Sequence, residues 1–409
     1  MIPSARSHCV LKRALAAVAA AALSSMAGGA SAAEVFKIGL IADYTGAFAT
    51  WGPQFEHAIA AYQAINGKTV KGPKGEDIEV QLVPRDVGSA GPDKAKQLAE
   101  ELVLREKVNM LAGFDLSPHA LAVAPIISEV KIPTVIMNAA TASITRASPY
   151  FVRTSYTLPQ WSASMAKWAA QQGYKRIYTV VSDYAPGYDA EAYFQKVFKE
   201  SGGAIVGSAR TPIQETNFAS YMEKVLEAKP DAFYSFQPGG SPSIALVKAF
   251  LERGLKAAGI KFLGNGEFDP TYLPNFSDDV IGSYSVNHYT ETNTFPENVE
   301  MRDQIHKMYG PKAPTEVASV AAWDGIKLIY LALHENGAHA DGLKYIASMT
   351  GKTFQSPRGT FMIDPAERDI VQNMYIREVR KVDGELANVD IATIPMVKDP
   401  WKQDNPAKK

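Results

Sequence analysis

The sequence has little cysteine, no excess of either charge and, after its first 33 residues, no long apolar run. Its 409 residues contain one cysteine, Cys9, which excludes an internal disulfide and a cysteine-based metal or iron–sulfur site. Lys and Arg number 42 against 43 Asp and Glu, so no basic surplus indicates a nucleic-acid partner. No stretch after residue 33 reaches the ~18 apolar residues that a membrane-spanning helix needs. We therefore expect neither a nucleic-acid-binding nor an integral membrane protein.

The usual short signatures of catalysis are missing as well. We find no GxxxxGKS/T, GxSxG or HExxH pattern, and Gly264–Gly266 lacks the third glycine of a dinucleotide-binding loop. Ser164–Lys167 matches SxxK, a pattern short enough to arise by chance on a helix surface. Ser117 and His119 stand two residues apart at a helix start, where a solvated or ligand-facing imidazole is the simpler interpretation. The sequence thus predicts a protein that is not an enzyme, with no cofactor and no metal; a hydrolase stays a distant alternative.

The composition that remains is that of a folded protein with two lobes. Hydrophobic residues make up 46% and charged residues 21% of the chain, close to globular averages. A length of 409 residues exceeds that of a common single domain.

Residues 1–33 read as a cleavable signal peptide. Three basic residues precede the apolar run Ala14–Leu23, and Ala30–Ala32 is a small-residue cleavage pattern. Cys9 precedes the apolar run, so it is not the lipidated cysteine of a lipoprotein. Removing the segment leaves 39 Lys and Arg against 43 Asp and Glu. We expect an exported, cysteine-free protein in the periplasm.

The rest of the chain alternates strand and helix patterns. Phe36–Ala42 is an apolar strand followed by a helix over residues 53–65, and Val317–Leu333 is a long apolar helix. Strands separated by helices predict parallel sheets with right-handed crossovers, and we place them in two doubly wound sheets. The other expected strands are 78–84, 108–112, 133–137, 176–181, 232–236 and 261–263.

Doubly wound sheets bind ligands beyond the carboxyl ends of their strands, and that rule selects six loops. These loops supply small polar residues and aromatic residues, which together are typical of a small-molecule site. Loops at sheet ends are, however, often polar for other reasons. The loops are 43–52, 113–118, 138–145, 182–189, 237–241 and 264–269, and their aromatic residues with those beside them are Trp51, Phe114, Tyr184, Tyr188, Phe236 and Phe268.

Two of these loops fit a ligand carboxylate. Ser117 stands at the N-cap of the helix that follows its strand, where free backbone N–H groups attract an anion. Thr141 follows the next strand and offers a hydroxyl beside exposed backbone. The alternative is two ordinary helix caps.

The chain resembles the substrate-binding proteins of branched-chain amino-acid-type ABC transporters, the leucine/isoleucine/valine-binding group. The likeness spans nearly all of the chain after residue 33, and it depends on the order and spacing of many weak matches. These are Phe36–Leu40, Thr45-Gly46, Trp51-Gly52, Ser117, Ala139–Thr141, Phe151–Thr154, Lys175–Ile177, Asp183, Gly187, Phe218, Asp231 and Trp323–Gly325.

The resemblance implies a type I periplasmic binding fold, in which two α/β lobes joined by a hinge enclose a ligand cleft. It places the N-terminal lobe at 34–158 with 289–366, the C-terminal lobe at 159–288 with 367–395, and a tail at 396–409. Lobe crossings fall near Leu158, His288 and Ile363–Ile370. The resemblance implies a receptor that captures a small carboxylate-bearing ligand, a branched-chain or related amino acid, by lobe closure and delivers it to an ABC permease, with the protein itself a monomer. The alternatives are the same role for an aromatic carboxylic acid and a periplasmic sensor subunit.

By resemblance, Ser117, Ala139, Ala140 and Thr141 bind a ligand carboxylate and ammonium, and Trp51 packs on its side chain. The second lobe departs from the family pattern, since Pro186 replaces an aromatic residue and Gln237 lies where a tyrosine is usual. Tyr184 and Tyr188 stand near the first change. The acidic partner of an ammonium falls on either Gly266 or Glu267. Glu267 would favour an amino acid, whereas Gly266 would favour an aromatic carboxylic acid.

Overall fold

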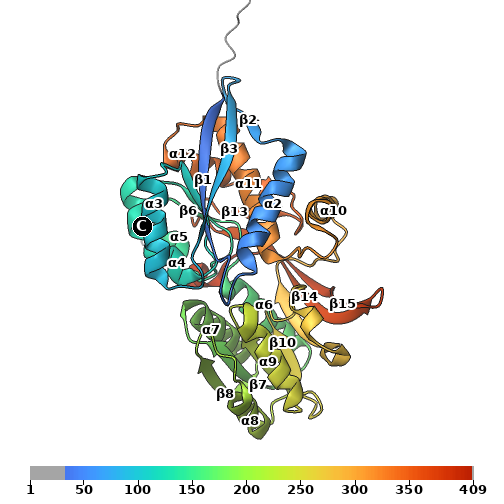
Figure 1. The fold of residues 1–409 in the computed structure, drawn as a ribbon. Coiled ribbons are helices and arrows are strands. Elements are labelled where there is room, and N and C mark those ends of the chain that lie inside the picture. The colour runs from blue at the N-terminus through green and yellow to red at the C-terminus, as the bar shows by residue number, and fades with distance from the viewer. Residues whose placement is uncertain (1–32, 408–409) are drawn as a thin grey trace, which may run out of the picture.

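The protein consists of two lobes stacked one above the other, as a computed structural model that describes residues 33–407 shows (Figure 1). Each lobe is built on one mostly parallel sheet covered by helices, which confirms the predicted two-lobe α/β fold. The expected signal peptide lies, except for residue 33, outside the described residues.

The N-lobe, the upper lobe in Figure 1, is built on a six-stranded sheet in the order β2-β3-β1-β4-β5-β6. Phe36, Ile38 and Leu40 of β1 pack with α2 and α11, whereas Ile41 packs with α3 and α4, so the sheet is covered on both faces. Its elements are β1 (Glu34–Ala42), β2 (Thr69–Lys71), β3 (Asp77–Asp86), β4 (Met110–Gly113), β5 (Thr134–Ile136), β6 (Phe151–Arg153), α2 (Trp51–Asn66), α3 (Pro92–Leu104), α4 (Ser117–Val130), α5 (Ile144–Ala147), α10 (Pro296–Tyr309), α11 (Val317–Asn336) and α12 (Gly342–Met349).

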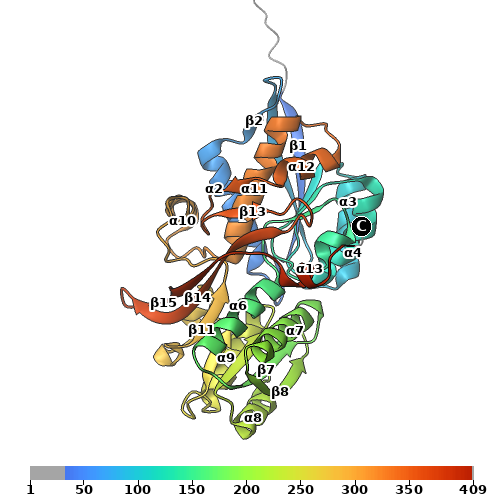
Figure 2. The ribbon, with the colours of Figure 1, turned by 180° about the vertical axis from the view of Figure 1, so that it is seen from behind.

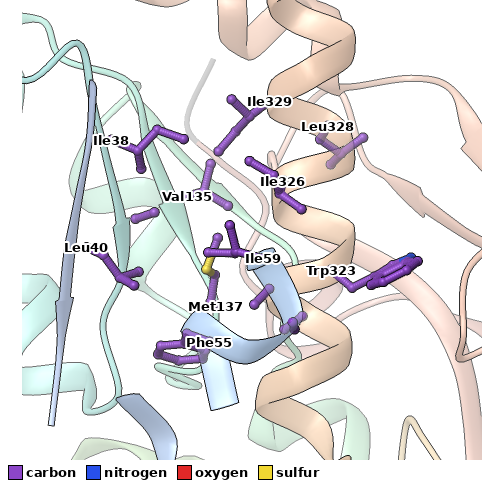
Figure 3. Packing of buried hydrophobic residues seen from close by; sticks show 14 of the residues in the cluster. Ile38, Leu40, Phe55, Ile59, Val135, Met137, Trp323, Ile326, Leu328 and Ile329 are labelled. Carbon is purple, nitrogen blue, oxygen red and sulfur yellow. The ribbon is translucent and has the colours of Figure 1, made fainter. Parts of the chain in front are cut away.

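Helix α11 is the central helix of the N-lobe core. Figure 3 shows Ile326 and Ile329 pointing toward Val135 of the sheet, with Ile59 of α2 beside them. Among residues 33–407, α11 is the one helix that is long and apolar enough to cross a membrane, but 83% of its apolar window is buried inside the protein. Packing within the N-lobe therefore accounts for its apolar composition.

The second sheet has nine strands, of which β8-β7-β9-β10-β11 are parallel neighbours in the C-lobe. Beyond β11 the order continues β14-β13-β12 with antiparallel pairing, and β15 pairs with β14. The elements are β7 (Arg176–Ser182), β8 (Ala204–Thr211), β9 (Ala232–Phe236), β10 (Lys261–Gly264), β11 (Tyr284–Asn287), β12 (Thr353–Phe354), β13 (Phe361–Ile363), β14 (Ile370–Val382), β15 (Glu385–Val397), α6 (Leu158–Gln171), α7 (Ala185–Glu200), α8 (Ala219–Ala228), α9 (Gly240–Glu252) and α13 (Pro400–Asp404), with short 3₁₀ turns at Leu273–Asn275 and Asp278–Val280.

The long hairpin of β14 and β15 is a part of the fold that the strand–helix pattern did not predict. Its turn is Asp383-Gly384, and both residues have positive φ, 52° and 89°. An Asp-Gly pair with two positive φ angles is the preferred two-residue hairpin turn. The hairpin lies where the lobes meet (Figure 2), so β14 pairs with β13 at one end and with β11 further along.

The last described residues are docked rather than extended. We expected a tail over 396–409, but β15 continues to Val397 and α13 follows it. Lys402 of α13 is buried and bonds Asp369 and Thr145.

Buried polar contacts hold the chain where it crosses between the lobes. The backbone oxygen of Ser155 accepts hydrogen bonds from Arg358 Nη1 at 3.0 Å and Gln372 Nε2 at 2.9 Å. Arg358 also pairs with Asp324 at 2.9 Å, and both side chains are fully buried. Thr157 then caps α6 through a reciprocal capping box with Gln160.

Candidate functional site

A cavity lies between the lobes. Most of its walls come from the loops after β4, β5, β7, β9 and β10, at the carboxyl ends of parallel strands, where folds of this kind bind ligands. Its lining residues are Trp51, Asp115, Ser117, Asn138, Ala140, Tyr156, Trp161, Tyr184, Pro186, Phe236, Gln237, Pro238, Gly239, Gly266, Asp269, Tyr272 and Val317.

Ser117 ties the two polar loops of the N-lobe together. Its Oγ accepts the backbone N–H groups of Ala140 at 3.1 Å and Thr141 at 3.0 Å. The expectation that Ser117 caps its own helix is wrong: Leu116 is the N-cap, and Ser117 is the first residue of α4. Since the Ser117 hydroxyl donates to no group within residues 33–407, its proton is available to a ligand in the cavity.

Asp115 and Asn138 lie beside Ser117 on the same wall. Asn138 Nδ2 donates to the backbone oxygen of Asp115 at 2.9 Å, and Asp115 Oδ2 accepts the backbone N–H of Asp43. The other oxygen of each side chain, Asp115 Oδ1 and Asn138 Oδ1, is buried without a hydrogen-bond partner in the described part of the chain. Burial, together with the nearby Asp43 carboxylate, raises the pKa of Asp115 well above its usual value.

The remaining groups expected to hold a ligand carboxylate bond to the protein itself. The backbone N–H of Ala139 donates to Phe114 at 2.9 Å. Thr141 Oγ1 donates to the carboxylate of Asp189 on α7, which also accepts the backbone N–H of Ala142 at 2.9 Å. Thr141 thus joins the N-lobe to the C-lobe rather than lining the cavity.

A second set of contacts also joins the two lobes. Glu316, before α11, accepts hydrogen bonds from Gln54 of the N-lobe and from the backbone N–H of Thr271 in the C-lobe. Near it, the C-lobe turn at Gly240 has φ +64°, and a Cβ added there would lie 2.2 Å from the backbone oxygen of Ala47. Only glycine permits this approach of the two lobes.

Aromatic rings form most of the remaining cavity wall. Tyr184 and Phe236 of the C-lobe are stacked with ring centroids 6.1 Å apart. Tyr156 stacks on Trp161 at 3.8 Å where the chain crosses between the lobes. Trp51 supplies a ring from the N-lobe. These flat apolar surfaces suit a planar ligand.

Glu267 supports the C-lobe loops from behind the cavity. Its carboxylate accepts the backbone N–H groups of Gln237 at 3.0 Å and Asn265 at 2.6 Å, while Gly266 lines the cavity in its place. Burial raises the pKa of Glu267 to about 7, although these N–H groups oppose the shift. Gln237 Oε1 accepts from Ser182 at 2.7 Å, and its Nε2 is a buried donor without a partner among residues 33–407.

Asp269 is the second acidic side chain of the cavity wall. Arg377 Nη2 donates to it at 2.8 Å and Asn287 Nδ2 at 3.3 Å. Burial raises the pKa of Asp269 to about 7 against the opposing effect of Arg377. The cavity lining, taken over the described residues, includes no Lys or Arg. A ligand anion would therefore be held by neutral donors.

The cavity gathers half of the residues proposed from the sequence. Phe114, with φ 68°, and Ala139 are buried in the N-lobe core. Tyr188 is 42% exposed, with its hydroxyl on Asp183 and its ring under Arg210. Those that line the cavity are Trp51, Ser117, Ala140, Tyr184 and Gln237; those that do not are Phe114, Ala139, Thr141, Tyr188 and Glu267.

His119 is neither solvated nor directed at a ligand, contrary to expectation. It is buried, and its Nε2 lies 3.0 Å from the backbone oxygen of Ala90. Burial lowers its pKa even though the Asp43 carboxylate opposes the shift. A neutral imidazole of this kind stabilises the loop before α3.

Several lining residues escaped the sequence analysis because they lie outside the six loops. Tyr156 and Trp161 belong to the crossing between the lobes, and Val317 begins α11. Asp115 was inside a selected loop, and its only signal was an acidic side chain two residues before Ser117.

Comparison with known proteins places the chain among extracytoplasmic receptors. The sequence model of the family described as "Periplasmic binding protein" matches residues 35–385. The chain is 38% identical over 386 residues to the Leu/Ile/Val-binding protein homolog 6 of Brucella melitensis biotype 1, covering 94% of this chain and 98% of that protein.

Two solved structures are similar over nearly their whole length. One is a solute binding protein of an ABC transporter from Rhodopseudomonas palustris BisB5 in complex with 3,4-dihydroxybenzoic acid, with 42% identity, TM-score 0.84, and coverage of 90% of this chain and 99% of that one. The other is a solute binding protein from R. palustris in complex with 4-hydroxybenzoate, with 40% identity, TM-score 0.86, and coverage of 90% and 98%.

Proposed function

The chain belongs to the periplasmic binding protein family and is a substrate-binding protein of ABC-transporter type, and on that premise we propose that it captures an aromatic carboxylic acid. The carboxylate would be held by hydroxyl, amide and indole donors, and the ring by the aromatic wall. Ser117, Gln237 and Trp161 supply donors on the cavity wall.

The observation that carries the proposal is how the acidic side chains around the cavity are paired and protonated. An α-amino acid brings an ammonium that needs a free carboxylate. Glu267 bonds two backbone N–H groups and does not line the cavity, and Asp269 is paired with Arg377. The raised pKa of Asp115 favours its neutral form. A ligand without an ammonium suits this set better than leucine does.

The aromatic wall supports the same choice of ligand. A flat ring can lie against Trp51, Tyr184 and Phe236 with a large contact area and little loss of conformational freedom. Two similar solute binding proteins were solved with hydroxylated benzoates, and they align over nearly all of this chain.

Capture would proceed by closure of the lobes. A ligand drives closure only if it binds the closed form more tightly than the open one. The contacts of Asp189 with Thr141 and of Glu316 with Thr271 would form as the lobes close, with hinges near Leu158, His288 and Ile363–Ile370. The closed receptor would act as a monomer in the periplasm and deliver its ligand to an ABC permease.

A ligand panel tests the proposed function. We expect benzoate and its hydroxylated derivatives to raise the melting temperature of the purified protein, because a ligand that binds the native state stabilises it by mass action. Leucine, isoleucine and valine at the same concentration should leave it unchanged. Differential scanning fluorimetry followed by titration calorimetry measures both.

Binding of leucine without binding of any aromatic acid would overturn the proposal and favour an amino-acid receptor, as the name of the Brucella relative suggests. Recovery of the bound aromatic acid unchanged after long incubation separates a receptor from an enzyme.

A further inference from the structure

Resting on the proposed function, we propose that Asp115 and Asn138 form a specificity subsite that reads a hydroxyl group on the aromatic ring of the ligand. Both side chains line the cavity, and each presents a buried oxygen that lacks a partner within the described residues. A buried polar atom left unpaired costs about 1–3 kcal/mol, so a ligand that pairs with both is favoured over one that pairs with neither.

Asn138 can only accept a hydrogen bond from the ligand. Its Nδ2 is engaged at 2.9 Å by the backbone oxygen of Asp115, a group that only accepts. That contact fixes the orientation of the amide and leaves Oδ1 as the atom without a partner in residues 33–407. A ligand group next to Asn138 must therefore donate.

Asp115 has the opposite requirement in its neutral form. Its Oδ2 accepts the backbone N–H of Asp43, so a proton on the carboxyl group resides on Oδ1. The surroundings favour that proton: the side chain is buried, and the carboxylates of Asp43 and Asp86 raise its pKa. His119 faces Asp43, and its own pKa is lowered by burial. Asp115 Oδ1 then donates to the ligand.

One donor beside one acceptor is the pattern that a hydroxyl group matches. A phenol donates its proton to Asn138 Oδ1 and accepts from Asp115 Oδ1. A carboxylate accepts only and leaves Asn138 unpaired, whereas an ammonium donates only and leaves the Asp115 proton unpaired.

Calorimetric titration with four ligands tests the subsite: benzoate, 3-hydroxybenzoate, 4-hydroxybenzoate and 4-methoxybenzoate. We expect at least one hydroxybenzoate to bind about tenfold or more tightly than benzoate. The methoxy compound keeps the acceptor for Asp115 and loses the donor for Asn138, so it should bind less tightly than 4-hydroxybenzoate. Equal affinity for benzoate and both hydroxybenzoates would overturn the subsite and leave the proposed function standing; failure of all four to bind would overturn both.

Variants connect the preference to the residues. Asn138→Ala and Asp115→Ala should each reduce the ratio of the benzoate to the hydroxybenzoate dissociation constant. Asp115→Asn should largely keep that ratio, because its amide can donate in place of the carboxyl proton. A merely structural role would weaken both ligands alike and leave the ratio unchanged. Ser243→Ala is the matched control, because its hydroxyl is also buried without a partner among the described residues but lies on α9 outside the cavity lining. An unchanged ratio in Asn138→Ala and Asp115→Ala contradicts the inference.

Discussion

Both walls of the cavity are built at the carboxyl ends of parallel strands, but they differ in how many of their polar groups are already hydrogen-bonded. On the N-lobe wall, Asp115, Ser117 and Asn138 each keep a polar atom or proton without a partner in residues 33–407. On the C-lobe wall, Gln237 keeps one donor without a partner among those residues, but Asp269 is paired with Arg377 and aromatic rings cover much of the surface. Glu267 lies behind this wall and bonds backbone N–H groups.

This difference indicates that the two walls have different roles in ligand binding. Polar groups held in place but left unpaired select a ligand, because the ligand alone can complete their hydrogen bonds. The aromatic rings exclude water from the cavity, and the turn at Gly240 allows the two lobes to approach each other closely. We infer that the N-lobe wall recognises the ring hydroxyl of the ligand, whereas the C-lobe wall, apart from Gln237, mainly encloses the ligand. The following variants test these roles, beginning with the largest expected effect.

Gly240→Ala should prevent full closure. Its Cβ would lie 2.2 Å from the Ala47 backbone oxygen of the other lobe, so we expect affinity to fall about 100-fold or more. Small-angle X-ray scattering with saturating hydroxybenzoate should show a larger radius of gyration than for the unaltered protein. Gly254→Ala is the control, since Gly254 also has positive φ, 76°, but has open space around its Cβ position. Equal effects of the two variants would mean that backbone strain, rather than contact between the lobes, is responsible.

Ser117→Ala should weaken every aromatic carboxylate about 30-fold, because it removes a donor to a charged group, worth about 2 kcal/mol. It leaves the backbone N–H groups of Ala140 and Thr141 without their acceptor. Thr141→Ala removes a contact between the lobes instead, so we expect a smaller loss of affinity and a more open unliganded protein. Titration calorimetry measures the loss of affinity, and small-angle X-ray scattering measures the opening of the unliganded protein. A larger loss of affinity in Thr141→Ala would return that residue to the ligand site.

Glu267→Gln should change stability and leave ligand affinity within about threefold. Burial raises the pKa of Glu267 from its ordinary 4.5 to about 7 in the folded protein. The folded state therefore holds the proton more tightly, and the resulting stability is complete below pH 4.5 and is lost as pH rises through 7, by up to about 3 kcal/mol.

Urea unfolding at pH 5, 6, 7 and 8 measures this slope. It should be shallower in Glu267→Gln, with the slope from Asp269 and Asp399, whose pKa values are also raised to about 7, still present. A large loss of ligand affinity in Glu267→Gln would instead place this carboxylate in contact with the ligand.

Much of the fold could be predicted because its signals are local. Apolar strands such as Phe36–Ala42, followed by turns and helices, predict parallel sheets, and strand ends predict the binding edge. The β14–β15 hairpin was missed although its Asp383-Gly384 turn and its pairing are local in the chain.

The sequence by itself determined two α/β lobes and the loops that contain Trp51, Ser117, Ala140, Tyr184 and Gln237. Only the tertiary structure decided which atoms of those loops are already bonded. Thr141 was assigned to a ligand, yet its hydroxyl bonds Asp189, a residue 48 positions along the chain. Glu267 and Gly266 are neighbours in sequence, but the turn directs one into backbone N–H groups and the other to the cavity. Hydrogen bonds between distant segments are long-range and directional, and residue type and spacing do not encode them.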